Sequence, residues 1–173
     1  HGFYDKRDAF EHSIRVPLLA FAPGKIKAGT ELDEMILNID LAPTLLEFAG
    51  IKKAENTPAF DGRSFKHLLD GNGSEKPWRD HLLYEYHWEW NFPATPTLFA
   101  IRTNRYKFIY YHGLWDKNGL YDLQTDPQER HNLIDVPAFA EKKETLKEQL
   151  FSELQASGAL EVPIRPPKGA PLH

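Results

Sequence analysis

One stretch decides the fold expected for this chain: residues 97–111, which read TLFAIRTNRYKFIYY. Runs rich in apolar and aromatic residues, at 97–102 and 106–111, flank the short polar segment Thr103-Asn104-Arg105. Strand-forming runs of this length on either side of a short polar segment are typical of a β-hairpin. The stretch therefore predicts two antiparallel strands joined by a tight turn.

Similar runs on both sides extend this hairpin into a sheet. Residues 81–86 predict a strand before it, and residues 119–123 predict a strand after it. Four short strands in succession favour an antiparallel sheet. Beyond them, residues at about 138–156 predict an amphipathic helix that packs on the sheet, and the Pro-rich tail from Val162 predicts an extended segment. The apolar face of that helix consists of Phe139, Leu146, Leu150 and Leu154.

The N-terminal part of the chain predicts α/β structure. Residues 14–21, IRVPLLAF, are almost continuously apolar, which is typical of a strand that is covered on both faces. Asp40 predicts the N-cap of a helix over residues 41–49, and Gly50 ends that helix.

A boundary between two parts is expected at the Gly- and Ser-rich residues 71–77. Aromatic residues concentrate beyond it, between Tyr84 and Trp115. We therefore expect an α/β portion at residues 1–75 and an antiparallel-sheet subdomain at residues 76–173.

Composition excludes several classes of protein and site. The 173 residues contain no Cys, which excludes disulfides, thiolate metal ligands and a Cys nucleophile. The net charge of −4 gives no basic footprint for nucleic acid. No apolar run approaches the roughly 20 residues of a membrane span. The sequence also lacks a Gly-rich phosphate loop, a His pair at metal spacing and a Gly-x-Ser-x-Gly motif, so the residues taken alone indicate little chemistry.

Six segments carry more information when they are read in order along the chain. They are DKRDAFEHSIRVPLL (residues 5–19), PGKI (23–26), NIDLAPTLL (38–46), DGRS (61–64), RTNRYK (102–107) and LYDLQTDP (120–127). These segments and their order resemble those of the formylglycine-dependent sulfatases. Six matches over about 120 residues are far more specific than a single motif. The segments YEYHWEW (84–90) and FPATPT (92–97) are most similar to N-acetylglucosamine-6-sulfatases, including mucin-desulfating enzymes.

The resemblance implies a fold and an activity. The fold is the C-terminal portion of an alkaline-phosphatase-like sulfatase core, followed by the small four-stranded antiparallel sheet and its C-terminal helix. The activity is sulfuric ester hydrolysis that removes sulfate from a sulfated sugar, such as 6-sulfated N-acetylglucosamine in glycosaminoglycans or mucin glycans. The expected partner is therefore a sulfated carbohydrate, without nucleic acid and without a membrane span.

The segment that carries the family's nucleophile is absent from this chain. The family's Cys/Ser-x-Pro-x-Arg segment, which supplies the formylglycine, does not occur, and neither do its acidic metal-binding segments. The resemblance therefore implies a fragment that is inactive alone. Its formylglycine and its Ca²⁺ ligands are expected in the missing N-terminal part of the same enzyme. Members of this family are periplasmic or secreted in bacteria and lysosomal in animals, which gives the two expected locations.

Lys6 and His1 are the catalytic residues that the resemblance implies. In the family a lysine precedes an aromatic-Glu-x-x-Ile/Val-Arg-x-Pro run by four positions, and Lys6 and Phe10 keep this spacing. We expect the Lys6 ammonium beside the sulfate and its bridging oxygen, where negative charge grows as the ester bond breaks. His1 matches a Gly-Glu-His-Gly position of the family. Without the resemblance, Lys6 reads as a surface lysine, and Glu11 and Arg15 read as a structural ion pair.

Four further residues are candidates for binding the sugar. Asp61 and Arg63 offer an acceptor and a donor for sugar hydroxyls, although turn chemistry alone also explains Asp-Gly before Ser64. His87 and Trp88 offer an aromatic wall, although aromatic rings here also fill an interface between sheet and core. No metal ligand is expected within this chain.

Two other functions remain open from the sequence. One is a phosphate or phosphonate monoester hydrolase of the same superfamily, which shares the α/β core. The other is a non-catalytic carbohydrate-binding module, in which the aromatic-rich sheet holds sugar by stacking. A Cys/Ser-x-Pro-x-Arg segment encoded upstream of His1 would favour the sulfatase.

Overall fold

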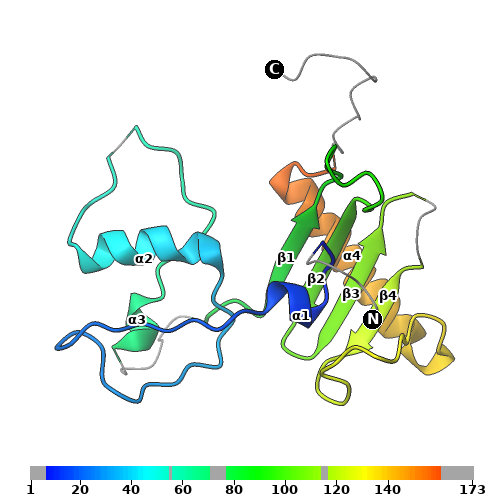
Figure 1. The fold of residues 1–173 in the computed structure, drawn as a ribbon, viewed down its shortest axis with the longest axis horizontal. Coiled ribbons are helices and arrows are strands. Elements are labelled where there is room, and N and C mark those ends of the chain that lie inside the picture. Colours follow the sequence, from blue (N-terminus) through cyan, green and yellow to red (C-terminus); the bar gives the residue numbers. More distant parts are fainter. Residues whose placement is uncertain (1–6, 55, 71–76, 114–116, 161–173) are drawn as a thin grey trace. The chain divides into compact units, whose positions relative to one another are not determined.

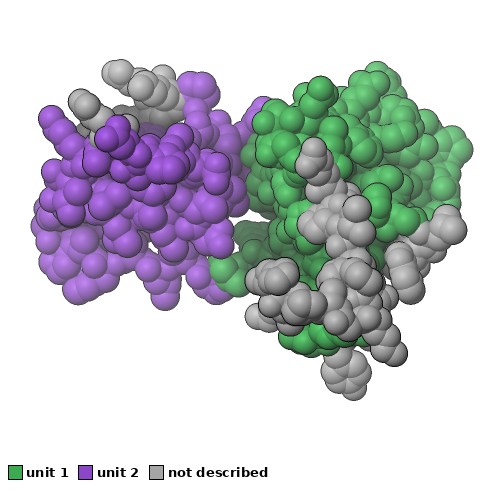
Figure 2. Space-filling view, turned by 90° about the horizontal axis from the view of Figure 1, so that it is seen from above, with its two compact units in different colours: residues 1–16, 81–173 green, residues 17–80 purple. Residues whose placement is uncertain are grey.

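A computed structural model describes residues 7–54, 56–70, 77–113 and 117–160 (Figure 1). The chain forms two compact units: residues 1–16 with 81–173, called here the sheet unit, and residues 17–80, called the helix unit (Figure 2). In chain order the elements are α1 (Glu11–Ile14), η1 (Asn38–Asp40), α2 (Leu41–Phe48), α3 (Lys66–Leu69), β1 (His81–Tyr86), β2 (Leu98–Thr103), β3 (Tyr106–Tyr111), β4 (Gly119–Asp122), η2 (Pro137–Phe139) and α4 (Ala140–Ser157).

The sheet unit contains the antiparallel sheet that the sequence predicts. The four strands are adjacent in the order β1-β2-β3-β4, and every neighbouring pair is antiparallel. Ala100 faces Ile109 across the central hairpin. The turn is closed by Thr103, whose hydroxyl accepts the Tyr106 N–H at 2.9 Å. The predicted hairpin and its two flanking strands are thus confirmed.

Each face of this sheet has its own apolar core, because side chains alternate along the strands. On one face α4 contributes Leu146, Leu150 and Leu154, which are almost fully buried, as the amphipathic pattern predicts. The helix ends at Gly158, whose left-handed backbone (φ 76°) suits a glycine. Figure 1 shows α4 behind the sheet and α1 in front of it. The sheet residues that face α4 are Phe99, Ile101, Phe108 and Leu120.

The opposite face is covered by the N-terminal segment. Ala9 and Phe10 are buried there, and the Phe10 ring packs edge-on against Tyr121 with centroids 5.8 Å apart. The sheet residues of this core are Leu98, Ala100, Ile109, Tyr111 and Tyr121. A segment from the start of the chain is therefore built into the core of the C-terminal sheet.

The helix unit has a small core around α3. Phe65, Leu68 and Leu69 are buried there, and Trp78 packs against them. Helix α2 begins at Leu41 as the sequence predicts, but the Asp40 carboxylate does not cap it. Asp40 has helical backbone angles (φ −80°, ψ −15°), whereas an N-cap needs an extended residue. Its carboxylate instead accepts the Leu37 N–H at 2.8 Å.

The predicted strand over residues 14–21 is wrong. Helix α1 ends at Ile14, and the following residues form no strand. The side chains of Val16, Leu19 and Phe21 are 68%, 93% and 92% exposed. A strand needs neighbours that complete its hydrogen bonds, and none of the strands in the described residues pairs with this segment.

The boundaries of the two compact units differ from the boundary between residues 75 and 76 that the sequence predicts. Residues 8–11 pack on the sheet although they precede the helix unit. The division into residues 1–75 and 76–173 concerned the domains of a longer enzyme, and it stays a prediction. The predicted extended tail from Val162 lies outside the described residues.

Candidate functional site

The two catalytic candidates, Lys6 and His1, lie outside the described residues. The described chain begins at Arg7, immediately after Lys6, so the contacts of the residues that follow Lys6 can be described. Residues 8–11 are all buried in the sheet unit. The contacts of residues 7–11 therefore show how the chain immediately after Lys6 is held on the sheet.

A buried lysine of β3 holds this segment. The Lys107 side chain is completely buried, and its Nζ lies 2.7 Å from the Ala9 carbonyl oxygen, to which it donates. Nζ also lies 2.7 Å from carboxylate oxygens of both Glu11 and Glu129. The second oxygen of Glu129 accepts the Glu11 backbone N–H at 2.6 Å. The ammonium is thus compensated by two carboxylates, as a buried charge requires.

Glu11 is paired differently from the sequence expectation. Its carboxylate contacts Lys107 and, at 3.4 Å, the Arg102 guanidinium of β2, whereas the Arg15 side chain is exposed. Burial alone would raise the pKa of Glu11, but Lys107 and Arg102 outweigh it and hold this pKa below its ordinary value. The cause is that both cations come from strands on which the segment lies, while Arg15 follows the end of α1. Glu11 therefore remains an anion at neutral pH.

A second attachment lies one residue before Ala9. The Tyr111 hydroxyl donates to the Asp8 carboxylate, with both oxygens 3.0 Å away. One of these oxygens also accepts the Ala9 N–H at 2.7 Å. Lys107 and Tyr111 therefore fix residues 8–11 from a single strand.

Arg7 contacts the aromatic loop between β1 and β2. The Arg7 guanidinium carbon lies 3.1 Å from the Phe92 ring centroid, and its Nε lies 3.7 Å from the Glu89 carboxylate. A guanidinium over an aromatic face is a favourable contact. This loop begins with the candidates His87 and Trp88. The residue next to Lys6 thus contacts the loop that the sequence predicts to bind sugar.

His87 and Trp88 lie differently on that loop. The His87 ring packs edge-on against Phe99 of β2, with centroids 5.7 Å apart, and its Nε2 lies 3.4 Å from the Glu85 carboxylate. The Trp88 backbone N–H donates to the Thr97 hydroxyl at 2.9 Å. Its ring meets Trp90 edge-on at 6.3 Å, and Trp90 is 44% exposed. His87 therefore packs on the sheet, while the two indoles offer aromatic surface at the loop.

Asp61 and Arg63 belong to the helix unit. Both side chains are exposed, and the Arg63 guanidinium carbon lies 4.1 Å from the Trp78 ring centroid. Asp61 and Arg63 thus lie on a loop of the helix unit, whereas His87 and Trp88 lie on a loop of the sheet unit.

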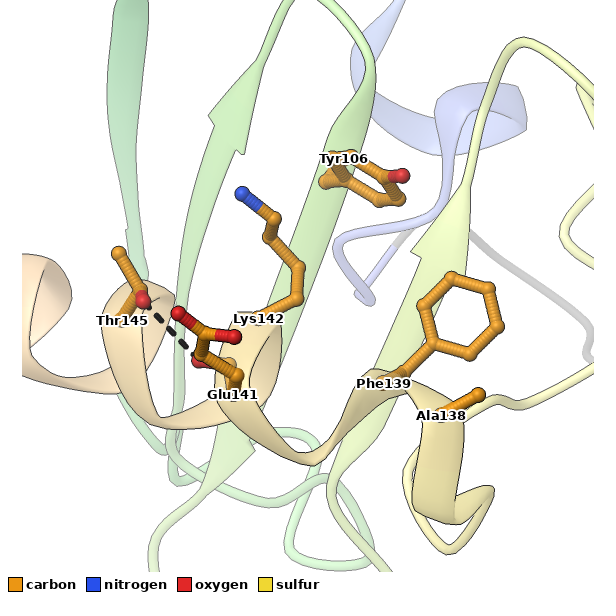
Figure 3. A pocket seen from close by; sticks show the side chains of 6 residues that line it. All are labelled: Tyr106, Ala138, Phe139, Glu141, Lys142 and Thr145. Carbon is orange, nitrogen blue, oxygen red and sulfur yellow. Dashed lines mark hydrogen bonds between the residues drawn. The ribbon is translucent and has the colours of Figure 1, made fainter.

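A shallow cleft that the sequence did not predict lies beside α4 (Figure 3). Its volume is about 310 Å³. The Lys142 side chain points toward Tyr106, with Nζ 5.3 Å from the ring centroid (Figure 3). None of the sugar-binding candidates is among its described lining residues. The lining residues are Tyr106, Ala138, Phe139, Glu141, Lys142 and Thr145.

Sequence reasoning also missed the buried role of Lys107. A signal for it exists, since alternation in β3 places Lys107 on the same face as Ile109 and Tyr111, which are buried. A lysine at such a position requires acidic partners. No comparable signal identifies Glu129, which lies in a loop.

The described residues contain no group of three or more His, Cys, Asp or Glu side chains arranged to hold a metal ion. Among them there is also no helix long and apolar enough to cross a membrane.

Comparisons with known proteins agree with this architecture. The profile of the family described as N-sulphoglucosamine sulphohydrolase, C-terminal, matches residues 1–156. An N-acetylglucosamine-6-O-sulfatase of Bacteroides thetaiotaomicron is 33% identical over 90% of this chain and 27% of its own length. The N-acetylglucosamine-6-sulfatase of Bos taurus is 41% identical over 54% of this chain and 16% of its own length.

A solved structure shares the fold of nearly the whole chain. It was determined in complex with its substrate, D-glucosamine-2-N,6-O-disulfate. It has a TM-score of 0.80 and 31% identity to this chain, covering 93% of this chain and 32% of that protein. The chain therefore spans about a third or less of the length of these relatives.

Proposed function

Because the chain belongs to the N-sulphoglucosamine sulphohydrolase C-terminal family, we propose that it is the C-terminal part of a sulfatase that acts on a sulfated amino sugar. The proposed substrate is 6-sulfated N-acetylglucosamine in a glycosaminoglycan or mucin glycan. The proposed partner is the N-terminal part of the same enzyme, and the proposed location is outside the cytoplasm, either exported or lysosomal.

One observation of the structure supports this proposal best. Arg7, the neighbour of Lys6, stacks on Phe92 in the loop that also carries His87 and Trp88. The segment proposed for catalysis and the loop proposed for sugar binding are therefore in contact within the sheet unit.

Lys6 has the central catalytic role in the proposal. Its ammonium stabilises the negative charge that grows on the bridging oxygen as the sulfate ester breaks, a type of contact that contributes a few kcal/mol. His1 lies in the same segment and is proposed as a second polar contact to the sulfate. Residues 8–11, which begin two positions after Lys6, are held by buried contacts to Lys107 and Tyr111.

The sugar itself is held by the remaining candidates in this proposal. Asp61 accepts from sugar hydroxyls and Arg63 donates to them. Trp88 presents its indole to the apolar C–H face of the ring, and His87 donates or accepts at the edge of the loop.

The formylglycine and the Ca²⁺ ion of the family supply the nucleophile and a hard cation for the sulfate oxygens when they are present. The residue that supplies the formylglycine and the ligands of the ion are proposed to lie in the longer protein, because the family's Cys/Ser-x-Pro-x-Arg segment does not occur in this sequence. The chain alone is therefore expected to bind sugar without hydrolysing it.

The proposal is tested with the longer protein. We expect sulfate release from 6-sulfated N-acetylglucosamine and little turnover of a phosphate monoester. Hydrolysis of only the phosphate ester would favour the phosphate or phosphonate hydrolase. Binding of the sugar without any turnover would favour a carbohydrate-binding module.

A further inference from the structure

Asp40 of the helix unit is a completely buried carboxylate that accepts four hydrogen bonds. It accepts backbone N–H groups from Leu37 at 2.8 Å and from Arg63 at 2.9 Å. It also accepts hydrogen bonds from the two terminal guanidinium nitrogens of Arg79, Nη1 at 2.5 Å and Nη2 at 2.7 Å. Both oxygens are occupied, so Asp40 has no capacity left for a ligand and must act through its protein partners.

One of these partners is the loop that carries two sugar-binding candidates. Asp40 bonds the backbone of Arg63, and Gly62 packs so closely that a Cβ there would lie 2.1 Å from the Ile39 carbonyl oxygen. Only glycine tolerates this approach. The Thr44 hydroxyl donates to the Asp40 carbonyl and accepts the Phe65 N–H at 3.1 Å. The backbone of this loop is thus pinned, while Asp61 and Arg63 remain exposed.

The other partner, Arg79, connects Asp40 to the ring beneath the Arg63 side chain. The Arg63 guanidinium lies 4.1 Å from the Trp78 ring centroid, and the Arg79 guanidinium lies 5.0 Å from it. The Trp78 indole N–H and the Arg79 guanidinium both donate to the Met35 carbonyl, at 2.8 Å and 3.2 Å. Asp40 therefore fixes the backbone of Arg63 directly and the aromatic platform of its side chain through Arg79.

We propose that Asp40 is a positioning residue that orients Arg63 toward the bound sugar. This inference rests on the proposed function, because it takes Arg63 as a sugar contact. A guanidinium that is held on a ring and a fixed backbone loses less freedom when it binds a ligand. Loss of this orientation weakens sugar binding and leaves the chemistry at the sulfate intact.

The test compares Asp40→Asn with Asp122→Asn. Asp122 is a matched control, since it is also buried, accepts from Arg105 on both carboxylate oxygens and accepts the Gln124 N–H, but holds no candidate sugar contact. In the longer protein we expect Asp40→Asn to raise KM for 6-sulfated N-acetylglucosamine about tenfold, with kcat nearly unchanged. Asp122→Asn should leave KM unchanged. Equal effects of the two variants on KM, or a loss confined to kcat, would overturn the positioning role.

Two further measurements separate this inference from the proposed function. Amide hydrogen exchange of Arg63 in this chain should accelerate in Asp40→Asn and stay unchanged in Asp122→Asn; unchanged exchange in both would overturn the inference. If Arg63→Ala leaves KM unchanged, the proposed sugar contact is wrong instead. If Asp40→Asn does not fold, Arg79→Lys serves as the second variant. It keeps the positive charge but loses the two-pronged guanidinium contact to Asp40, and it should also raise KM.

Discussion

The Lys107 ammonium lies 2.7 Å from the Glu129 carboxylate, and neither side chain is exposed to solvent. Glu129 holds this position with a left-handed backbone (φ 54°), which is unfavourable for a residue other than glycine. The same ammonium binds Glu11 and the Ala9 carbonyl. One buried charge thus joins β3, the loop after β4 and the segment that follows Lys6.

Removal of this charge should strongly destabilise the sheet unit. Lys107→Ala leaves the buried Glu129 carboxylate without a cation and leaves Glu11 with only the more distant Arg102. Breaking a buried pair in this way costs about 3–5 kcal/mol. We expect a decrease of that size in the free energy of unfolding, measured by urea denaturation.

The control is Lys117→Ala. Lys117 pairs with Asp135 on the surface, where both side chains are more than 60% exposed. Such a pair contributes at most about 1 kcal/mol. A loss of similar size in both variants would contradict the importance of the buried cluster.

Glu11 should make the stability of the sheet unit depend on pH. Lys107 and Arg102 outweigh the effect of burial and lower the pKa of Glu11 in the folded state, so the folded protein holds the proton less tightly than the unfolded chain. This contribution is complete above the ordinary Glu value of 4.5 and is lost as the pH falls through the lower folded pKa.

The measurement is the free energy of unfolding between pH 7 and pH 3 for the native chain and Glu11→Gln. We expect the difference between them to be constant above about pH 5.5 and to shrink below pH 4.5. A difference that does not change with pH would show that Glu11 stabilises the fold without its charge.

The sequence predicts the sheet well because its signals are local. Alternation and a polar turn define the hairpin at residues 97–111, and the apolar spacing of α4 matches the face that Leu146, Leu150 and Leu154 bury. The placement of residues 8–11 could not be predicted. Lys107 binds the Ala9 carbonyl across 98 positions of sequence, and no local pattern encodes such a contact.

The site was predicted less completely for a different reason. The family resemblance identifies Asp61, Arg63, His87 and Trp88 as candidates. The contacts that hold these side chains depend on packing, which the sequence does not reveal. Asp40 was expected to cap a helix, because the sequence does not reveal that its carboxylate turns back to Leu37 and Arg63. The strand over residues 14–21 failed because strand pairing depends on neighbours as well as on composition.

The exposed apolar segment should make this chain associate in solution. Leu19 and Phe21 are more than 90% exposed, and clustered exposed apolar side chains promote association. We expect the double variant Leu19→Lys, Phe21→Lys to shift the chain toward monomer in sedimentation analysis, without loss of stability. A native chain that is already monomeric at high concentration would contradict this prediction.

Lys6→Ala should lower the rate of sulfate transfer in the longer protein much more than it weakens sugar binding. The ammonium is proposed to lie where negative charge grows, so its loss appears in kcat and in kcat/KM together. Arg63→Ala removes a contact to the sugar and should raise KM first. Lys6→Arg should not restore the rate, because a planar guanidinium does not replace a compact ammonium in a packed site. The measurement is steady-state kinetics of the three variants on 6-sulfated N-acetylglucosamine and on an aryl sulfate, which lacks the sugar. A near-normal kcat for Lys6→Ala on both substrates would make Lys6 a surface lysine. Removal of a charge that lies beside the breaking ester bond would slow the departure of the leaving oxygen.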